Sequence, residues 1–376
     1  MSNSAKRLFI FTIYRVVLFS GVALVLVLSF AFMDAIRVFY FGEGNVFRHS
    51  RGQLAVHFLD VGNGDATVIQ FPSGRVGVID GGPDRTSRQV IDYIHRRVVR
   101  RGGRIDFVIS THPNINALGG LPDILKEFRV DTVYRPIIQS RSEHDRDNGT
   151  LEPIDNIPAL YTYFIDVAHE RANNVRIIEQ GHYVACEQHN YRLFFHTPTT
   201  DQIPVGLLVT NEISPIITLE FGGHVFVFTG RAGPTGEGQF MQTTSAQTLF
   251  AHAHDNDWQI HLRAANLVHS NEYAFLDFIE PTTATLSTQQ SDIHHALLGR
   301  LLARTSGEHL HITQELGHIA YRVSSADFKI FTGFENPWQL WWLFFTLIFA
   351  LFVVTFFDFK PKSQPHQDIC EEPQEQ

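Results

Sequence analysis

The chain has 376 residues, of which 44% are hydrophobic and 18% charged, enough to bury a full core in one or two globular domains. Its 30 Lys and Arg against 39 Asp and Glu give a net charge of −9, which disfavours a generally basic nucleic-acid binder. Cys186 and Cys370 are the only cysteines, so a disulfide framework and a cysteine-rich zinc module are excluded.

Two uncharged apolar stretches lie near the ends of the chain, at residues 16–33 and 337–357. A membrane-spanning helix needs about 20 apolar residues, with aromatic residues at the interface and lysines beyond it. Tryptophans begin the second stretch, and basic residues stand on the terminal side of both: Lys6, Arg7, Arg15, Lys360 and Lys362. We therefore expect two transmembrane helices, between a cytoplasmic segment 1–15 and a polar cytoplasmic tail 358–376.

The positive-inside rule then places the middle of the chain on the extracytoplasmic side of the cell membrane, as part of a two-pass protein. In this topology Cys186 and Cys370 lie on opposite sides and cannot pair. An alternative for residues 16–33 is a cleaved signal peptide, since Ser29-Phe30-Ala31 has the small-residue pattern of a cleavage site. The alternative for residues 337–357 is a buried core helix.

The central segment, 51–330, alternates strand and helix signals. In chain order we predict strands at 54–59, 66–71 and 76–79, a helix at 88–101, a strand at 105–109, a helix at 121–128, strands at 215–220 and 224–228, a helix at 274–279, a strand at 284–287, a helix at 296–305 and a strand at 318–323. Phe221-Gly-Gly223 predicts a hairpin turn. Early and late hairpins with helices between them favour a layered α/β sandwich.

Several motifs resemble those of one family. His57-Phe-Leu-Asp-Val-Gly-Asn-Gly-Asp-Ala66 followed by Val78-Ile-Asp-Gly-Gly82 is similar to the opening of the metallo-β-lactamase fold, in its ComEC-type DNA-uptake form. Further similar segments follow in the family's order: 105–120, 211–214, 221–223, 229–231, 267–270 and 294–301. The resemblance implies a four-layer αββα metallo-β-lactamase-like sandwich. It lacks the many membrane helices and the extra N-terminal domain of the uptake proteins, so their transport role is not implied.

Most of the family's metal ligands are replaced. Members of the fold are hydrolases that hold one or two metal ions on a motif of the form H-x-H-x-D-H. The resemblance places His112, Asn114, Asn116 and Ala117 at these ligand positions, and only His112 is a good zinc ligand. Arg231 stands where the family has a metal-bridging aspartate, and a guanidinium repels cations and has no lone pair to offer. His269 is retained beside Ser270, and His294 is one more candidate.

These replacements predict a pseudoenzyme without a metal and without catalytic residues. Arg231 is expected to neutralise whatever acids remain nearby, such as Asp60, Asp65 or Asp80. One alternative is a membrane-bound hydrolase with a single zinc ion on His112, His269 and His294. Another is a pocket that keeps a phosphate- or carboxylate-binding role, with Arg231 as the anion clamp.

The retained Asp and Gly residues have a structural interpretation. Glycines permit tight turns, and Asp side chains in turns cap backbone amides. Asp60, Asp65, Asp80, Gly81 and Gly82 are therefore predicted to shape the loops around the pocket rather than to perform chemistry.

The expected partners are the membrane and another protein of a membrane complex. An arginine-rich segment, 85–104, could meet the phosphates of nucleic acid or of lipids, which leaves DNA handling as a further alternative. An ion-paired helix face is the interpretation we favour for it. His252, His254, Asp255 and Asp257 are predicted to lie in a solvated loop.

Overall fold

The computed structural model describes residues 51–99, 103–136, 138, 158–198, 213–288, 292–305, 309–324 and 327–332, with residues 12, 13, 20, 21 and 24. The chain divides into a unit of residues 44–335 and a second unit of residues 1–43 and 336–376. The expected membrane helices at 16–33 and 337–357 lie outside the described residues, apart from three positions, 20, 21 and 24. Within the described residues, no helix is both long enough and apolar enough to cross a membrane.

Residues 44–335 contain two β-sheets. The first has the strand order β15-β14-β1-β2-β3-β4-β5-β6, and its strands β3 to β6 run parallel. The bounds are β1 Leu54–Phe58, β2 Ala66–Gln70, β3 Val76–Gly81, β4 Arg104–Ile109, β5 Arg129–Arg135, β6 Ala172–Ile177, β14 Ile319–Val323 and β15 Phe328–Thr332.

The second sheet has the order β13-β12-β11-β10-β9-β8-β7, and its strands β10 to β13 run parallel. The bounds are β7 Tyr183–Cys186, β8 Tyr191–Phe195, β9 Ile217–Phe221, β10 His224–Phe228, β11 Gln259–Arg263, β12 Thr283–Leu286 and β13 Leu310–Ile312. The predicted hairpin is present between β9 and β10, and Gly222 and Gly223 turn it with φ of 58° and 79°. Two consecutive positive φ angles are the geometry of a two-residue hairpin loop that follows the strand twist.

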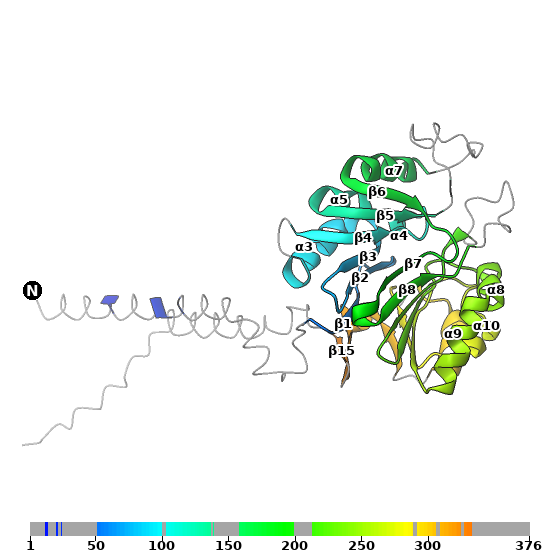
Figure 1. Ribbon diagram of the computed structural model, residues 1–376. Coiled ribbons are helices and arrows are strands. Elements are labelled where there is room, and N and C mark those ends of the chain that lie inside the picture. The colour runs from blue at the N-terminus through cyan, green and yellow to red at the C-terminus, as the bar shows by residue number, and fades with distance from the viewer. Residues whose placement is uncertain are drawn as a thin grey trace, which may run out of the picture. The chain divides into compact units, whose positions relative to one another are not determined.

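Helices cover the outer face of each sheet (Figure 1). Over the first sheet lie α3 Ser87–Arg97, α4 Ile115–Leu118, α5 Leu121–Glu127 and α7 Ala159–Arg171. Over the second lie α8 Pro234–Gln242, α9 Thr244–Asp255, α10 Tyr273–Ile279 and α11 His295–Arg304, and the short α12 Thr313–Leu316 follows β13.

Three hydrophobic clusters fill the spaces between these layers. In β1, Ala55 joins the cluster under α3, α5 and α7, whereas Val56 and Phe58 join the cluster between the sheets. The third cluster packs Val225 and Val227 of β10 against the helices of the second sheet. Alternate side chains of one strand thus enter different layers, as the pleat requires. The result is a mixed α/β fold with two sheets, in agreement with the predicted αββα sandwich.

Some predicted elements differ from the structure. The helix expected at 88–101 is α3, which ends at Arg97. The loop expected around His252 and His254 is wrong, because both lie in the last turn of α9. Their side chains are exposed, and the helix holds them only through its apolar face, where Leu249 and Phe250 are buried.

A buried polar chain crosses the layer between the sheets. His224 Nδ1 lies 2.9 Å from His261 Nε2, and His261 Nδ1 lies 2.9 Å from the hydroxyl of Thr283. The hydroxyl of Tyr321 donates to Thr283 over 3.3 Å and lies 2.5 Å from His311 Nδ1. Burial lowers the pKa of His224 to about 4 and that of His261 well below its usual value, so both rings are neutral at physiological pH.

Candidate functional site

The carboxyl ends of four strands meet at one edge of the sandwich, where the resemblance places a metal site. Asp80 is the second-last residue of β3, and Thr111 lies shortly after the end of β4. Arg231 follows β10, and Arg263 is the last residue of β11. Because β3 and β4 are parallel neighbours, as are β10 and β11, the loops after them lie side by side.

Asp80 is locked onto the end of the neighbouring strand. Its carboxylate accepts a hydrogen bond from the backbone N–H of Thr111 at 2.8 Å and another from the Thr111 hydroxyl at 2.6 Å. Burial, together with the nearby charge of Asp65, raises the pKa of Asp80 to about 7, against the lowering effect of Thr111 and Arg263. Asp80 therefore ties β3 to β4 from a φ of 58°, which agrees with its predicted role in shaping the loop.

Arg263 supplies the positive charge of this edge. Its guanidinium donates to the carboxylate of Asp65 in the loop between β1 and β2, and the side chains are only 6% and 19% exposed. The same guanidinium donates to the backbone oxygen of Ala264 at 2.6 Å. The expectation that Arg231 neutralises the acids is wrong, since Asp65 pairs with Arg263 instead.

Arg231 has a different environment. Its backbone N–H donates to the hydroxyl of Ser214 at 2.8 Å, and that hydroxyl donates to the backbone oxygen of Thr111 at 3.3 Å. Its guanidinium has no hydrogen-bond or ion-pair partner among the described residues, and Nε is buried. Gly230 before it has a φ of 52°, and a Cβ there would lie 2.6 Å from the Ser214 hydroxyl. The Ser214 hydroxyl thus links three segments of the resemblance, those of Thr111, Ser214 and Arg231, at their backbones.

At this edge the retained aspartates bind partners through their carboxylates, and the retained glycines allow close contact or turning of the backbone. Asp60 caps the backbone N–H of Gly62 at 3.3 Å, as predicted, whereas the side chain of Asp65 pairs with Arg263 and does not cap a turn. Gly81 has no room for a side chain, because a Cβ would lie 2.7 Å from the backbone N of Leu121. Gly82, with a φ of 71°, donates its N–H to the backbone oxygen of Asp65 at 2.7 Å.

The residues at the four family ligand positions mostly form hydrogen bonds with backbone groups. His112 is buried, and its Nδ1 accepts from the N–H of Asn114 at 3.1 Å. The Asn114 side chain caps α4 by accepting from the N–H of Asn116 at 2.8 Å. The backbone oxygen of Asn116 accepts from the N–H of Asp65 at 3.0 Å, and Ala117 is fully buried. This turn is a helix start held by amide groups.

The second histidine segment is also anchored to the protein. His269 is exposed, whereas Ser270 beside it is buried and donates to the backbone oxygen of Ala265 at 2.9 Å. Arg300 of α11 donates to the backbone oxygens of Val268 and Ser270 at 2.6 and 2.7 Å.

A buried acid holds the far end of the same segment. Glu237 of α8, 1% exposed, accepts from the backbone N–H groups of Asn271 and Glu272. Burial raises the pKa of Glu237 to about 7. His294 lies apart, exposed at the start of α11, where its Nδ1 accepts from the N–H of Ala296 at 3.3 Å.

This donor set does not fit zinc. Among the described residues, no three His, Cys, Asp or Glu side chains lie together in a way that could hold a metal ion. His112 is buried while His269 and His294 are exposed, so the expected single-metal triad is not assembled. Structural zinc needs four such ligands and catalytic zinc three. The Arg263 guanidinium, moreover, already satisfies the carboxylate of Asp65.

Arg263, Glu237 and Arg300 were missed in the sequence, and a signal existed for Arg263. Arg263 ends the apolar run Ile260-His-Leu262, and a charge at the end of a buried strand requires a partner. Glu237 lies among small and polar residues of α8, and Arg300 lies on α11 between leucines. Their role becomes visible only when the 268–272 segment is placed beside them.

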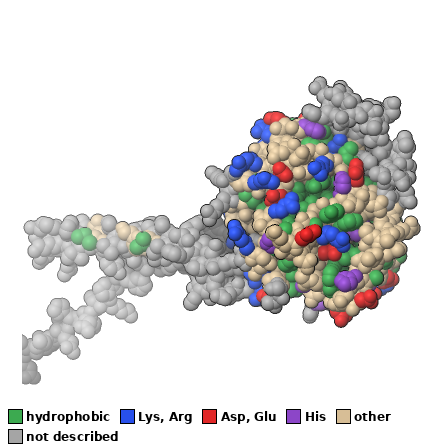
Figure 2. Space-filling view, viewed as in Figure 1, with side chains coloured by type: hydrophobic (Ala, Val, Ile, Leu, Met, Phe, Trp, Pro, Cys, Tyr) green, Lys and Arg blue, Asp and Glu red, His purple; other side chains and the backbone are tan. Residues whose placement is uncertain are grey.

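The arginine-rich segment is ion-paired where it is described. Arg88 and Arg96 lie 3.3 and 3.9 Å from the carboxylate of Asp92, and Arg104 lies 3.5 Å from both Asp106 and Asp131. Figure 2 shows Lys and Arg side chains interspersed with Asp and Glu on the visible face. The pairs of Arg88 and Arg96 with Asp92 lie on α3, as an ion-paired helix face requires, whereas Arg104 is the first residue of β4.

No protein-family model matches the chain, and neither does any curated protein. Among solved structures, a variant of the metallo-β-lactamase of Cronobacter sakazakii is 14% identical with a TM-score of 0.31, over 46% of this chain and 60% of its own. The subclass B3 metallo-β-lactamase MEM-A1, from a soil metagenome library, is 16% identical with a TM-score of 0.28, over 48% and 61%. Rubredoxin oxygen:oxidoreductase from Desulfovibrio gigas is 10% identical with a TM-score of 0.29, over 48% and 40%. The chain thus spans less than two thirds of each of these proteins, and such likenesses decide neither its family nor its activity.

Proposed function

We propose that this protein is a membrane-anchored, non-hydrolytic relative of the ComEC-type metallo-β-lactamase domain, in which an arginine replaces the metal ion. It serves as a binding or assembly module for a protein partner in a membrane complex. The family assignment is supported by sequence motifs that occur in the family's order, and by the hydrogen bonds that join three of them, at Thr111, Ser214 and Arg231.

The contact between Arg263 and Asp65 carries the proposal. In a metal enzyme of this fold, cations hold the loops at the strand ends and activate water. Here a guanidinium on the second sheet neutralises a carboxylate on the first, which fulfils the first task and leaves the second undone. A guanidinium is always charged and offers no exchangeable water ligand.

The primary experiment measures metal content and turnover together. We expect the full-length protein, purified without chelators, to contain less than 0.1 zinc, manganese or iron per chain by elemental analysis, and not to hydrolyse bis-p-nitrophenyl phosphate. A metal at a stoichiometry of one or more, with turnover lost on chelation, overturns the proposal. The variant N114H/N116D/A117H/R231D, which restores four of the family's ligands, is the comparison: a metal-free parent and a metal-binding repair locate the loss in these positions.

The membrane arrangement is tested through the two cysteines. The positive-inside rule puts Cys186 outside and Cys370 inside, and Cys186 is partly exposed. A membrane-impermeant maleimide added to intact cells is expected to label the Cys370→Ser variant and not the Cys186→Ser variant. The reverse pattern contradicts the topology, and labelling of neither variant before lysis places the domain inside the cell.

A further inference from the structure

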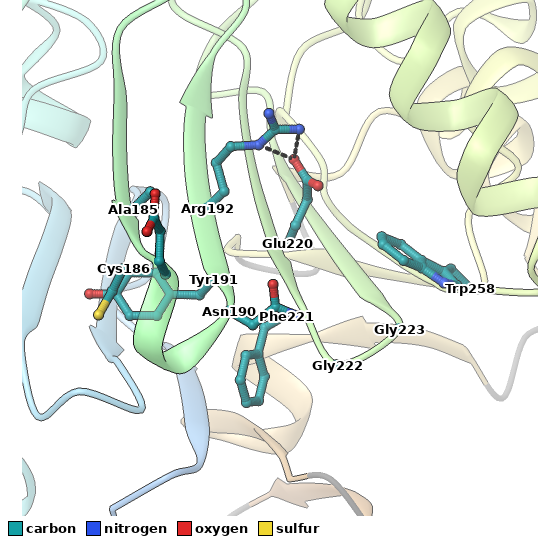
Figure 3. Close-up of a pocket in the computed structure, with 11 residues that line it drawn as sticks. Ala185, Cys186, Asn190, Tyr191, Arg192, Glu220, Phe221, Gly222, Gly223 and Trp258 are labelled. Atoms are coloured by element: carbon teal, nitrogen blue, oxygen red, sulfur yellow. Dashed lines mark hydrogen bonds and ion pairs between the residues drawn. The ribbon is translucent and has the colours of Figure 1, made fainter.

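A second candidate site lies on the outer face of the second sheet, along strands β8 and β9. Two cavities of about 330 and 310 Å³ follow strands β8 and β9 and share the side chains of Arg192 and Glu220. Figure 3 shows this ion pair between the strands, with Trp258 across the first cavity. The second cavity runs between β8 and the first two turns of α9. Volumes of this size are at the lower end of those that hold small molecules.

A serine and a histidine meet in the wall of the second cavity. Ser245 Oγ lies 2.8 Å from His196 Nδ1, and His196 Nε2 lies 2.9 Å from the hydroxyl of Thr218. The imidazole is 1% exposed, with the rings of Phe194 and Phe240 at 4.7 and 5.1 Å from it, so its orientation is fixed. Ser245 is only partly buried and borders the cavity. A nucleophile, a base at hydrogen-bond distance and a third group behind the base are the parts of an acyl-transfer site.

We propose that Ser245 and His196 form an active site, independent of metal and separate from the edge that carries Arg263, that hydrolyses small carboxylic esters. Phe194 and Leu249 supply an apolar wall for a short acyl chain, and Arg192 marks the polar end of the cavity. The site shares no residue with the edge that carries Arg263. The inference and the proposed function can therefore be tested independently of each other.

The start of α9 provides electrostatic help. Ser245 is the second residue of the helix, and the Thr243 hydroxyl caps the N–H of Ala246 at 3.2 Å. The N–H groups of Thr244 and Ser245 have no acceptor among the described residues. Free amides in the first turn carry partial positive charge, which stabilises an oxyanion formed next to Ser245.

The reaction has two steps. Ser245 Oγ attacks the carbonyl carbon of the ester while its proton passes to His196 Nδ1, and the alcohol leaves with that proton as the acyl–serine bond forms. Water then attacks the acyl carbon, gives a proton to His196, and releases the carboxylic acid as the proton returns to Ser245. Thr218 accepts from Nε2 and thereby holds the tautomer in which Nδ1 can accept.

The protonation of His196 gives the site a distinctive pH profile. Burial, and then the charge of Arg192, lower the pKa of His196 to about 3. The other titratable groups bordering the cavity are Glu220 on β9 and His252 on α9. His196 is therefore neutral at pH 5, where an ordinary histidine is protonated, and acylation should continue there. A base this weak also implies slow turnover.

A covalent probe tests the inference on the full-length protein. We expect a fluorophosphonate to add to Ser245, identified by peptide mass spectrometry, and p-nitrophenyl butyrate to be hydrolysed equally well with and without EDTA. Ser245→Ala should lose at least 100-fold of this turnover, and Thr218→Val about 10-fold, whereas Ser324→Ala, at a partly exposed serine directly after β14, should match the parent. The acylation rate should fall less than twofold between pH 7 and pH 5.

Three outcomes overturn the inference. They are a folded protein without an adduct at Ser245, turnover unchanged by Ser245→Ala, and turnover that disappears with chelation. Because Ser245→Ala leaves Nδ1 of the buried His196 without this partner, the thermal unfolding midpoint is measured beside the activity, and the variant is assayed where it is fully folded. Loss of activity then reports on the chemistry and not on the fold.

Discussion

Arg263 at the end of β11 and Asp65 after β1 form an ion pair that joins the two sheets where the parallel strands end. The pair is nearly enclosed, and Asp80 lies close enough for its carboxyl to be influenced by both partners. Among the described residues, neither side chain has a second ion-pair partner. The pair therefore decides whether this edge is stable without a metal ion.

Removing the guanidinium should be costly. Arg263→Met leaves the Asp65 carboxylate beside Asp80 in a dry environment, and we expect the free energy of unfolding to fall by about 3–5 kcal/mol in urea titrations. Arg263→Met with Asp65→Asn should recover at least about 1 kcal/mol relative to Arg263→Met alone.

Arg304→Met is the matched control for this experiment. It breaks another arginine–aspartate pair, with Asp277, whose side chains are 36% and 54% exposed. Such an exposed pair contributes little to the free energy of unfolding. Equal losses at Arg263 and Arg304 would contradict the importance of the buried pair.

Asp80 should make stability fall as pH rises from about 4 to about 7. Its folded-state pKa of about 7 lies above the ordinary value of 3.8, so the folded protein binds this proton more tightly than the unfolded chain. The resulting stabilisation is complete below pH 3.8 and is lost as pH rises through about 7. Asp80→Asn cannot ionise, so its cost relative to the parent should be smaller at pH 8 than at pH 5. A cost that grows with pH would mean that Thr111 and Arg263 hold Asp80 ionised.

The buried histidines change the free energy of unfolding with pH in the opposite direction. The pKa of His224 is lowered to about 4, mainly by burial, so the folded state favours the neutral ring. This stabilisation is complete above pH 6.5 and is lost as pH falls toward 4. His224→Gln should reduce the slope of unfolding free energy against pH by about one proton between pH 6 and 4.5.

Gly230 tests the packing of the motif loops. An alanine Cβ there would lie 2.6 Å from the Ser214 hydroxyl and 3.0 Å from Thr111 Cβ, at a φ of 52°. We expect Gly230→Ala to cost about 2–4 kcal/mol, from strain and displacement together. Gly181→Ala has a φ of 86° with nothing within 4 Å of the new Cβ, and should cost only about 1 kcal/mol. Similar costs at both sites would show that the loops yield easily.

The fold was largely readable from local patterns. The apolar, β-rich run of β1 and the Gly222-Gly223 turn depend on neighbours in the chain, so the strand and the hairpin were predicted correctly. The helix α7 and the strand β8 are among the elements that the sequence patterns did not predict. In β8, Arg192 interrupts the apolar run, and only the placement of Glu220 beside it explains that charge.

The site divides along the same line. The prediction that these positions do not bind a metal rests on residue types alone, because Asn114, Ala117 and Arg231 are poor or impossible zinc ligands wherever they lie. Which arginine neutralises the acids does not follow, because Arg263 and Asp65 are 198 residues apart in the chain. Two neighbouring parallel strands end in Thr229-Gly-Arg231 and Arg263, and spacing along the sequence cannot tell which side chain reaches the other sheet. Residue type determines what a group can bind, whereas the stacking of two sheets determines what it meets, because ion pairing depends on distances that only the packed chain sets.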